Sequence, residues 1–325
     1  MENILMSEEM VNEKNAKGSR HSLALQNNIP LVGLAAVLLL FAIITKGKSL
    51  GPANLLLIFQ QSLVLLICST GVFFVMTVGG LDFSQGAIIG VASIAFIVAG
   101  QQHLFLGILA GCAVGLGIGL INGVIHVKGK VGSFIVTICS MLAFRGVCAL
   151  LTTKAPYSAP TYIYLINSWA IYLPIVIGVL AVGWVISSGT KLGKQIRAIG
   201  SGEVAARYSG IKVGRIKMFA FAFAGLLAGL AATVNVFRVG SITASAGALT
   251  ETNVMIALVL GGLPVTGGAK TSFLSVLSGV FILSILNNGL ALMQIEPNVQ
   301  QFIRGIIFLA IVAITTDRKS TGIIK

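Results

Sequence analysis

Two charged side chains lie within or between long apolar runs, where a charge is costly and therefore marks a functional candidate. Asp82 stands in Gly-Gly-Leu-Asp-Phe-Ser-Gln-Gly, residues 79–86, at the junction of two runs. The flanking glycines allow a tight turn, and we expect the Asp82 carboxylate to cap the following helix with support from Ser84. Arg145 lies in the middle of another run, beside Gly146. We expect it to face the interior of a helix bundle and to pair with a carboxylate or free carbonyl groups, with Asp82 as one possible partner.

Amide side chains inside the apolar runs form a second set of candidates: Gln60, Gln61, Asn122, Asn235, Asn287 and Asn288. An amide in a bilayer ordinarily bonds across helices, so packing is the first interpretation for each. The alternative is a polar path for a solute, which Gln60, Gln61, Asn287 and Asn288 are the candidates to line. The two adjacent asparagines favour a path most, because neighbouring helix positions cannot both face one packed surface. No series of acidic residues accompanies these amides, which argues against an ion-coupled pump.

Sequence motifs for catalysis fail or are missing. Residues 261–272, GGLPVTGGAKTS, look like a phosphate-binding loop, but Pro264 and Ala269 occupy the two positions where that pattern requires glycine. The three histidines lack metal-ligand spacing, and the four cysteines lie in apolar runs as small buried side chains. The sequence therefore predicts no enzyme, no metal and no cofactor, and any ATP must be used by another chain.

The composition is typical of a membrane protein. Of the 325 residues, 56% are hydrophobic and only 10% are charged, and long apolar runs recur in a way that a soluble domain does not need. A formal net charge of +13 indicates a nucleic-acid partner in some soluble proteins. Here the basic residues fall in the gaps between apolar runs, as in multispanning proteins, so we expect no nucleic-acid partner.

We expect an all-α polytopic membrane protein with about ten transmembrane helices, since a span needs about 20 mostly apolar residues. Residues 1–29 are polar and predict a disordered cytoplasmic tail, followed by a transmembrane domain over 30–318 and a second cytoplasmic tail over 319–325. The predicted spans are 30–45, 53–78, 84–101, 104–126, 132–153, 170–187, 216–236, 250–264, 271–293 and 300–316. The third and eighth are the most diluted by glycine and polar residues.

Basic residues predict the orientation. An even number of spans places the N- and C-termini on the same side, which we expect to be cytoplasmic. In that arrangement 16 of the 22 basic residues lie inside, five lie outside and Arg145 lies within a span. This excess favours the arrangement over its inverse. The five residues expected outside are Lys46, Lys48, Lys154, Arg238 and Arg304.

Glycine recurs at every fourth position of the predicted span 104–126: Gly107, Gly111, Gly115, Gly119 and Gly123. Four residues advance a helix by about 400°, so these glycines form one slowly drifting stripe. Such a stripe lets the backbone of another helix approach closely, and tight packing is its expected role. Gly225 and Gly229 repeat the spacing in a later span.

The loop at residues 188–217 carries seven basic residues against one acid, Glu203. Ser201 is predicted to cap a short helix there, and Glu203 lies in its first turn, where the helix dipole favours an anion. Gly210 is the expected end of that helix. The charge distribution places this loop in the cytoplasm, where a capped helix is a candidate docking point for a partner.

Several of these stretches, in the same order, resemble permease subunits from ATP-binding-cassette importers of ribose, xylose, galactose and related simple sugars. The similar segments are Gly-Gly-Leu-Asp-Phe-Ser at 79–84, Phe-Arg-Gly at 144–146, the loop at 198–211 and the glycine-rich turn at 260–268. The resemblance runs from about residue 30 to residue 318. Permeases for branched-chain amino acids and nucleosides are similar to this chain with looser versions of the same motifs.

The resemblance implies a transport subunit without catalysis of its own in a bacterial plasma membrane. Two permease chains, identical or different, form the pathway within the lipid; separate cytoplasmic ATPase subunits drive it, and an extracytoplasmic binding protein delivers the sugar. The short helix of the loop 188–217 is similar to the one that couples to the ATPase, with contacts implied for Ser201, Glu203, Ala205, Ala206, Tyr208, Gly210 and Ile211. Asp82, Ser84, Arg145, Gly115 and Gly119 stand as signature or structural residues.

Alternative cargoes within the same superfamily are a nucleoside, a sugar derivative of the autoinducer type or a branched-chain amino acid. A stand-alone channel or secondary transporter is a more remote alternative.

Overall fold

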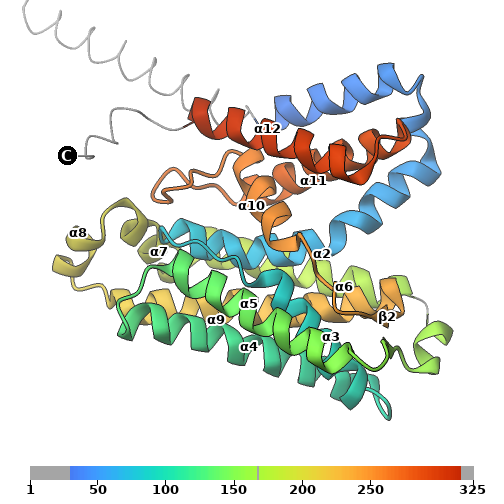
Figure 1. The fold of residues 1–325 in the computed structure, drawn as a ribbon. Coiled ribbons are helices and arrows are strands. Elements are labelled where there is room, and N and C mark those ends of the chain that lie inside the picture. Colours follow the sequence, from blue (N-terminus) through green and yellow to red (C-terminus); the bar gives the residue numbers. More distant parts are fainter. Residues whose placement is uncertain (1–29, 167, 316–325) are drawn as a thin grey trace, which may run out of the picture.

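The computed structural model describes residues 30–166 and 168–315, and these residues form a bundle of helices (Figure 1). The first half contains the helix Pro30–Ile44, η1 (Lys48–Leu50), α2 (Pro52–Thr77), α3 (Gln85–Ala99), α4 (Leu104–Lys128), α5 (Ser133–Thr152), β1 (Tyr157–Ser158) and η2 (Thr161–Leu165). The second half contains α6 (Ser168–Trp184), η3 (Val185–Gly189), α7 (Lys191–Ser201), α8 (Glu203–Tyr208), α9 (Val213–Val239), β2 (Ser241–Ile242), α10 (Thr250–Leu260), α11 (Leu274–Leu292) and α12 (Pro297–Thr315). The predicted all-α class is confirmed. The predicted tails 1–29 and 319–325 lie outside the described residues.

Each of the ten predicted spans corresponds to an apolar helix. Six helices are long and apolar enough to cross a membrane: α2, α4, α5, α6 with its π-helical extension η3, α9 and α11. The apolar helices at the other four predicted spans are shorter: Pro30–Ile44, α3, α10 and the apolar part of α12, Pro297–Ala313. The chain is therefore a multispanning membrane protein in which several helices do not reach across the bilayer by themselves.

The two most diluted predicted spans form helices that are a few residues shorter than their apolar runs. α3 has 15 residues and α10 has 11, which corresponds to about 22 and 16 Å against a hydrocarbon core of about 30 Å. α10 begins at Thr250, the predicted start, directly after Gly247 and Leu249, whose left-handed backbone angles (φ of 70° and 64°) keep the helix from extending further back, and it ends early, at Leu260. Both helices therefore start inside the bundle, after a stretch of irregular chain that is itself packed against protein.

The helix α2 forms the centre of the bundle, and its residues from Ser62 to Thr77 are almost all buried. It is apolar on every side, as a helix surrounded by other helices must be. α9 packs beside it and against α4 (Figure 1). At the contact between α4 and α9 a Cβ atom added at Gly115 would overlap the carbonyl oxygen of Gly225, and one at Gly119 would overlap that of Phe221. The two backbones touch directly, which is the close approach that the glycine spacing predicts.

The two ends of the bundle differ. One end carries α7 and α8, and the other carries a small antiparallel ladder in which Tyr157 pairs with Ile242 and Ser158 with Ser241 (Figure 1). Neither α7 nor the ladder was expected from the sequence. The predicted orientation would place α7 and α8 in the cytoplasm and the ladder outside.

Candidate translocation site and docking surface

A polar pocket of about 390 Å³ lies near the end of the bundle that carries the β-ladder. It is built by α2, the end of α9, β2, the irregular segment that leads into α10, the start of α10, and α11. The polar side chains among its lining residues are Gln61, Asn235, Arg238, Ser241, Thr243, Ser245, Thr250, Asn253 and Asn287. None of the described lining residues is acidic.

This lining offers hydrogen bonds from amides and hydroxyls together with one cation, Arg238. Part of the set is held in place by its own contacts. The Asn235 amide donates to the Ser93 hydroxyl at 3.3 Å, and the Arg304 guanidinium of α12 donates to the side-chain oxygen Oδ1 of Asn253 at 3.0 Å. A cavity with convergent neutral polar groups suits a ligand that carries many hydroxyl groups.

The structure separates the four amides that the sequence proposes for a path. Gln61 and Asn287 line the pocket, whereas Gln60 does not. Asn288 exchanges two hydrogen bonds of 2.9 Å with Asn54 of α2, so it joins two helices. The adjacent asparagines thus face different surroundings, one toward the pocket and one toward a helix contact.

Asp82 lies at the centre of a buried polar network where α3 begins, and its side chain is almost fully buried. Its carboxylate accepts hydrogen bonds from the Ser84 N–H at 2.9 Å, the Ser84 hydroxyl at 2.6 Å and the Gln85 amide at 2.7 Å. Asn122 of α4 donates to the Ser84 hydroxyl at 3.0 Å. The carboxylate therefore closes a turn just ahead of the helix, and the N–H groups that it binds do not include those of the first helical turn.

Arg145 pairs with Glu251, not with Asp82. The Arg145 guanidinium of α5 donates to Glu251 Oε1 at 2.6 Å, and Glu251 lies in the first turn of α10. The suggestion of Asp82 as partner is wrong, because the Asp82 carboxylate is already bound by its own neighbours. Sequence reasoning missed Glu251, although an acid inside the predicted span 250–264 was a usable signal.

The starts of α3 and α10 touch each other. A Cβ atom added at Gly86 would overlap both the Glu251 carboxylate and the carbonyl oxygen of Gly247. Gly247 also lines the polar pocket. The ion pair, the start of α3 and the pocket therefore form one continuous region of packed residues.

The loop 188–217 contains two helices instead of one. Ser201 is the last residue of α7, and its hydroxyl donates to the Arg197 carbonyl oxygen at 2.9 Å. The predicted capping role of Ser201 is wrong, because Gly202 separates the helices and occupies the N-cap position of α8. Gly210 follows α8 with φ of 78°, which fits its predicted place at the helix end.

The exposed side of α8 differs from the set of contacts implied by the family resemblance. Tyr208 and Val204 are 89% and 69% exposed, and Ala205 is exposed beside them. Ala206 is only 4% exposed and Ile211 packs partly against the core. The surface that a partner can reach therefore includes Val204, which sequence reasoning missed, and excludes Ala206.

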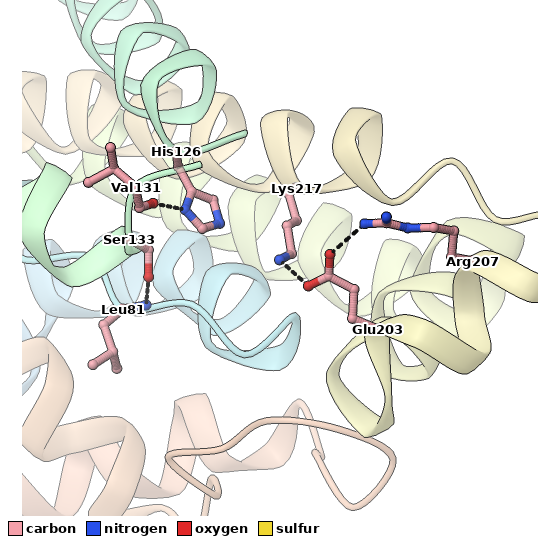
Figure 2. A network of polar contacts seen from close by, with 7 residues as sticks. All are labelled: Leu81, His126, Val131, Ser133, Glu203, Arg207 and Lys217. Atoms are coloured by element: carbon pink, nitrogen blue, oxygen red, sulfur yellow. Dashed lines mark hydrogen bonds and ion pairs between the residues drawn. The ribbon is translucent and has the colours of Figure 1, made fainter. Parts of the chain in front are cut away.

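Glu203 ties α8 to the bundle (Figure 2). Its carboxylate accepts from Lys217 of α9 at 2.6 Å and from Arg207 at 3.1 Å. The hydrogen bond from the Lys217 ammonium lowers the pKa of the Glu203 carboxyl. Figure 2 also shows Ser133, at the start of α5, accepting from the Leu81 N–H at 3.0 Å, which ties the turn before α3 to the next helix.

Comparison with known proteins identifies the family. Residues 54–312 match the family described as branched-chain amino acid transport system / permease component. The chain is 33% identical to the ribose import permease protein RbsC of Escherichia coli K12, with 88% of this chain and 92% of the relative covered. It is also 33% identical to RbsC of Bacillus subtilis 168, with 90% and 93% covered. Identity to the galactose/methyl galactoside import permease protein MglC of Escherichia coli K12 is 30%, with 86% and 90% covered.

No solved structure matches this chain. The family match covers most of its length and contains the described helices from most of α2 to most of α12, together with the polar pocket and α8. The chain therefore belongs to the family of permease components of the branched-chain amino acid transport system.

Proposed function

We propose that this chain is the membrane-spanning subunit of an importer for a simple sugar, with ATP hydrolysis on separate chains. The similar proteins are named as permeases for ribose and for galactose and methyl galactoside, and others are named for D-allose and xylose. A monosaccharide is the cargo class that these names share. The polar pocket is the site that we assign to it.

The chemistry of the pocket supports a sugar over a branched-chain amino acid. A sugar presents hydroxyl groups that both donate and accept, and amides and hydroxyls satisfy both roles. An amino acid presents an ammonium group, for which the described lining offers no carboxylate.

The partners follow from the same proposal. The exposed side of α8, with Val204, Ala205 and Tyr208, is the surface that we assign to the ATPase subunit. The opposite end, which carries the β-ladder and lies near the pocket, is the side that we assign to an extracytoplasmic binding protein. Two permease chains, identical in the simplest case, complete the assembly. The mass of the purified complex in nanodiscs tests that number.

Uptake by the complete system tests the assignment of the pocket. The permease is reconstituted in vesicles with its ATPase subunit and its binding protein, and ATP-driven uptake of labelled monosaccharides and of leucine is measured. Gln61→Leu is expected to lower sugar uptake about tenfold, because it removes a polar group from the pocket. Gln60→Leu is the matched control. The Gln60 side chain is next to Gln61 in the sequence but lies outside the pocket, so this variant should leave uptake near wild type. Uptake of leucine but of no sugar would overturn the proposal.

A second measurement tests the docking surface. Tyr208→Ala is expected to weaken co-purification of the ATPase subunit while the permease stays folded, because this side chain is almost fully exposed. Ala206→Glu is a poor test, because a charge placed at that buried position threatens the fold. Undiminished ATPase binding in Val204→Ala/Tyr208→Ala would refute the surface.

A further inference from the structure

A second cavity, of about 260 Å³, lies between the helix Pro30–Ile44, α2 and α11. Its lining is apolar and comes from all three helices: Leu34 and Leu38, Leu55 and Ile58, and Phe281 and Ile285. Leu55 remains 43% exposed, so the cavity is a groove with an open side. An apolar groove on the face of a membrane helix loses contacts unless an apolar body fills it.

Two lysines lie in the turn that connects two of the helices lining this groove. Lys46 and Lys48 lie in the turn between the helix Pro30–Ile44 and α2, and both are exposed. Neither forms a salt bridge with the residues that the structure describes. Leu38 and Leu34 lie six and ten residues before Ile44, which places them about 9 and 15 Å below the turn along the helix axis. The two lysines and the apolar groove thus follow one another along the axis of the helix Pro30–Ile44.

The turn that carries the lysines is fixed in place. Asn54 donates to the Ser49 carbonyl oxygen at 2.8 Å and is itself held by the paired amide of Asn288 from α11. The Ser49 N–H donates to the Thr45 hydroxyl at 3.1 Å. The lysine positions are therefore set by contacts to two of the helices that form the groove.

The two charges run against the expected charge distribution. In the predicted orientation Lys46 and Lys48 are two of only five basic residues outside, where basic residues are not favoured. A phosphate-bearing headgroup supplies the anion that the described residues do not. We propose that this groove binds one phospholipid with an anionic headgroup, with the phosphate at Lys46 and Lys48 and an acyl chain along Leu38 and Leu34.

Lipid binding to the purified permease in its complete complex tests the proposal. Native mass spectrometry measures adducts of phosphatidylglycerol and of zwitterionic phosphatidylcholine at equal concentration, and inorganic phosphate serves as the probe without acyl chains. Phosphatidylglycerol is expected to bind more tightly than phosphatidylcholine, and phosphate alone is expected not to bind. Lys46→Gln/Lys48→Gln should weaken phosphatidylglycerol binding about 30-fold, on the basis of about 1 kcal/mol for each lysine. Leu38→Trp, which fills the groove, should weaken both lipids.

Lys128→Gln/Lys130→Gln is the matched control, because it removes the same charge from the last residue of α4 and the turn that follows it. It should leave the phosphatidylglycerol adduct unchanged. An equal loss in both double variants would show general charge attraction and overturn the site. Cross-linking of two permease copies through cysteines placed at Leu38 would show that a second copy covers the groove, and would overturn it as well.

Discussion

Two helices, α3 and α10, begin inside the bundle, and each has a buried carboxylate where it starts. Asp82, ahead of α3, is held by Ser84 and Gln85, which lie two and three residues further along the chain. Glu251, in the first turn of α10, is held by Arg145 from another span, and its second carboxylate oxygen has no hydrogen-bond partner among the described residues. One start is stabilised by local neutral donors and the other by a distant cation.

This difference separates a local turn from a tertiary contact. The Asp82 network forms wherever the chain folds into that turn, since every donor to the carboxylate comes from within three residues. The start of α10 depends on α5 for its charge and on Gly86 for its space. Because the segment before α10 also lines the polar pocket, a displacement of α5 or α3 acts on the pocket through this contact.

The largest expected effect comes from removing the cation. Arg145→Met leaves the Glu251 carboxylate, which is 7% exposed, without a partner. We expect a loss of about 3 kcal/mol in the free energy of unfolding, as for other broken buried ion pairs. Unfolding of the permease in detergent micelles by increasing amounts of sodium dodecyl sulfate measures this free energy.

The double variant Arg145→Met/Glu251→Gln is the control for that effect. It removes both charges, so most of the lost stability should return. If the double variant is as unstable as Arg145→Met, the loss arises from packing of the arginine and not from the stranded carboxylate.

Gly86→Ala tests the contact between the two helix starts and is expected to cost about 2 kcal/mol, because the new methyl group overlaps Glu251 and Gly247. Sugar uptake should fall with it, since Gly247 lines the pocket. Gly117→Ala is the control, because nothing lies within 4 Å of a Cβ atom at that position of α4. Equal unfolding curves for the two variants would contradict the close contact.

Much of the fold was predictable from the sequence, and the reason is physical. Apolar runs long enough to span a bilayer identify helices by length and composition, and the glycine spacing of α4 identifies a face for close packing. The partner of Arg145 was not predictable, because an ion pair between residues 106 positions apart depends on how spans pack. The end of α7 at Ser201 was missed because local capping signals at Ser201 and at Gly202 compete, and tertiary contacts decide between them.

Glu251→Gln is expected to have a smaller effect, about 1 kcal/mol. The Arg145 side chain is 26% exposed and can be solvated, and the glutamine carbonyl oxygen can still accept its hydrogen bond. The same titration measures the change. A loss larger than that of Arg145→Met would reverse the assignment of the buried partner.

The smallest expected effect is that of Asp82→Asn, about 0.5 kcal/mol. The asparagine carbonyl oxygen keeps both bonds from Ser84. The remaining bond reverses its direction, because the Gln85 amide can rotate and its carbonyl oxygen, which has no partner among the described residues, can accept from the new amide group. Loss of the buried charge removes a desolvation cost that offsets the weaker hydrogen bonds.

Asp82→Ala, by contrast, deletes the acceptor for all three donors and should cost about 2 kcal/mol. The pair of variants therefore distinguishes a need for the polar contacts from a need for the negative charge at Asp82. If Asp82→Asn is as damaging as Asp82→Ala, the charge itself is required at the start of α3. The start of α3 would then depend on a charge, as the start of α10 does. Asp82 would have to act on a cation or a solute that enters the bundle.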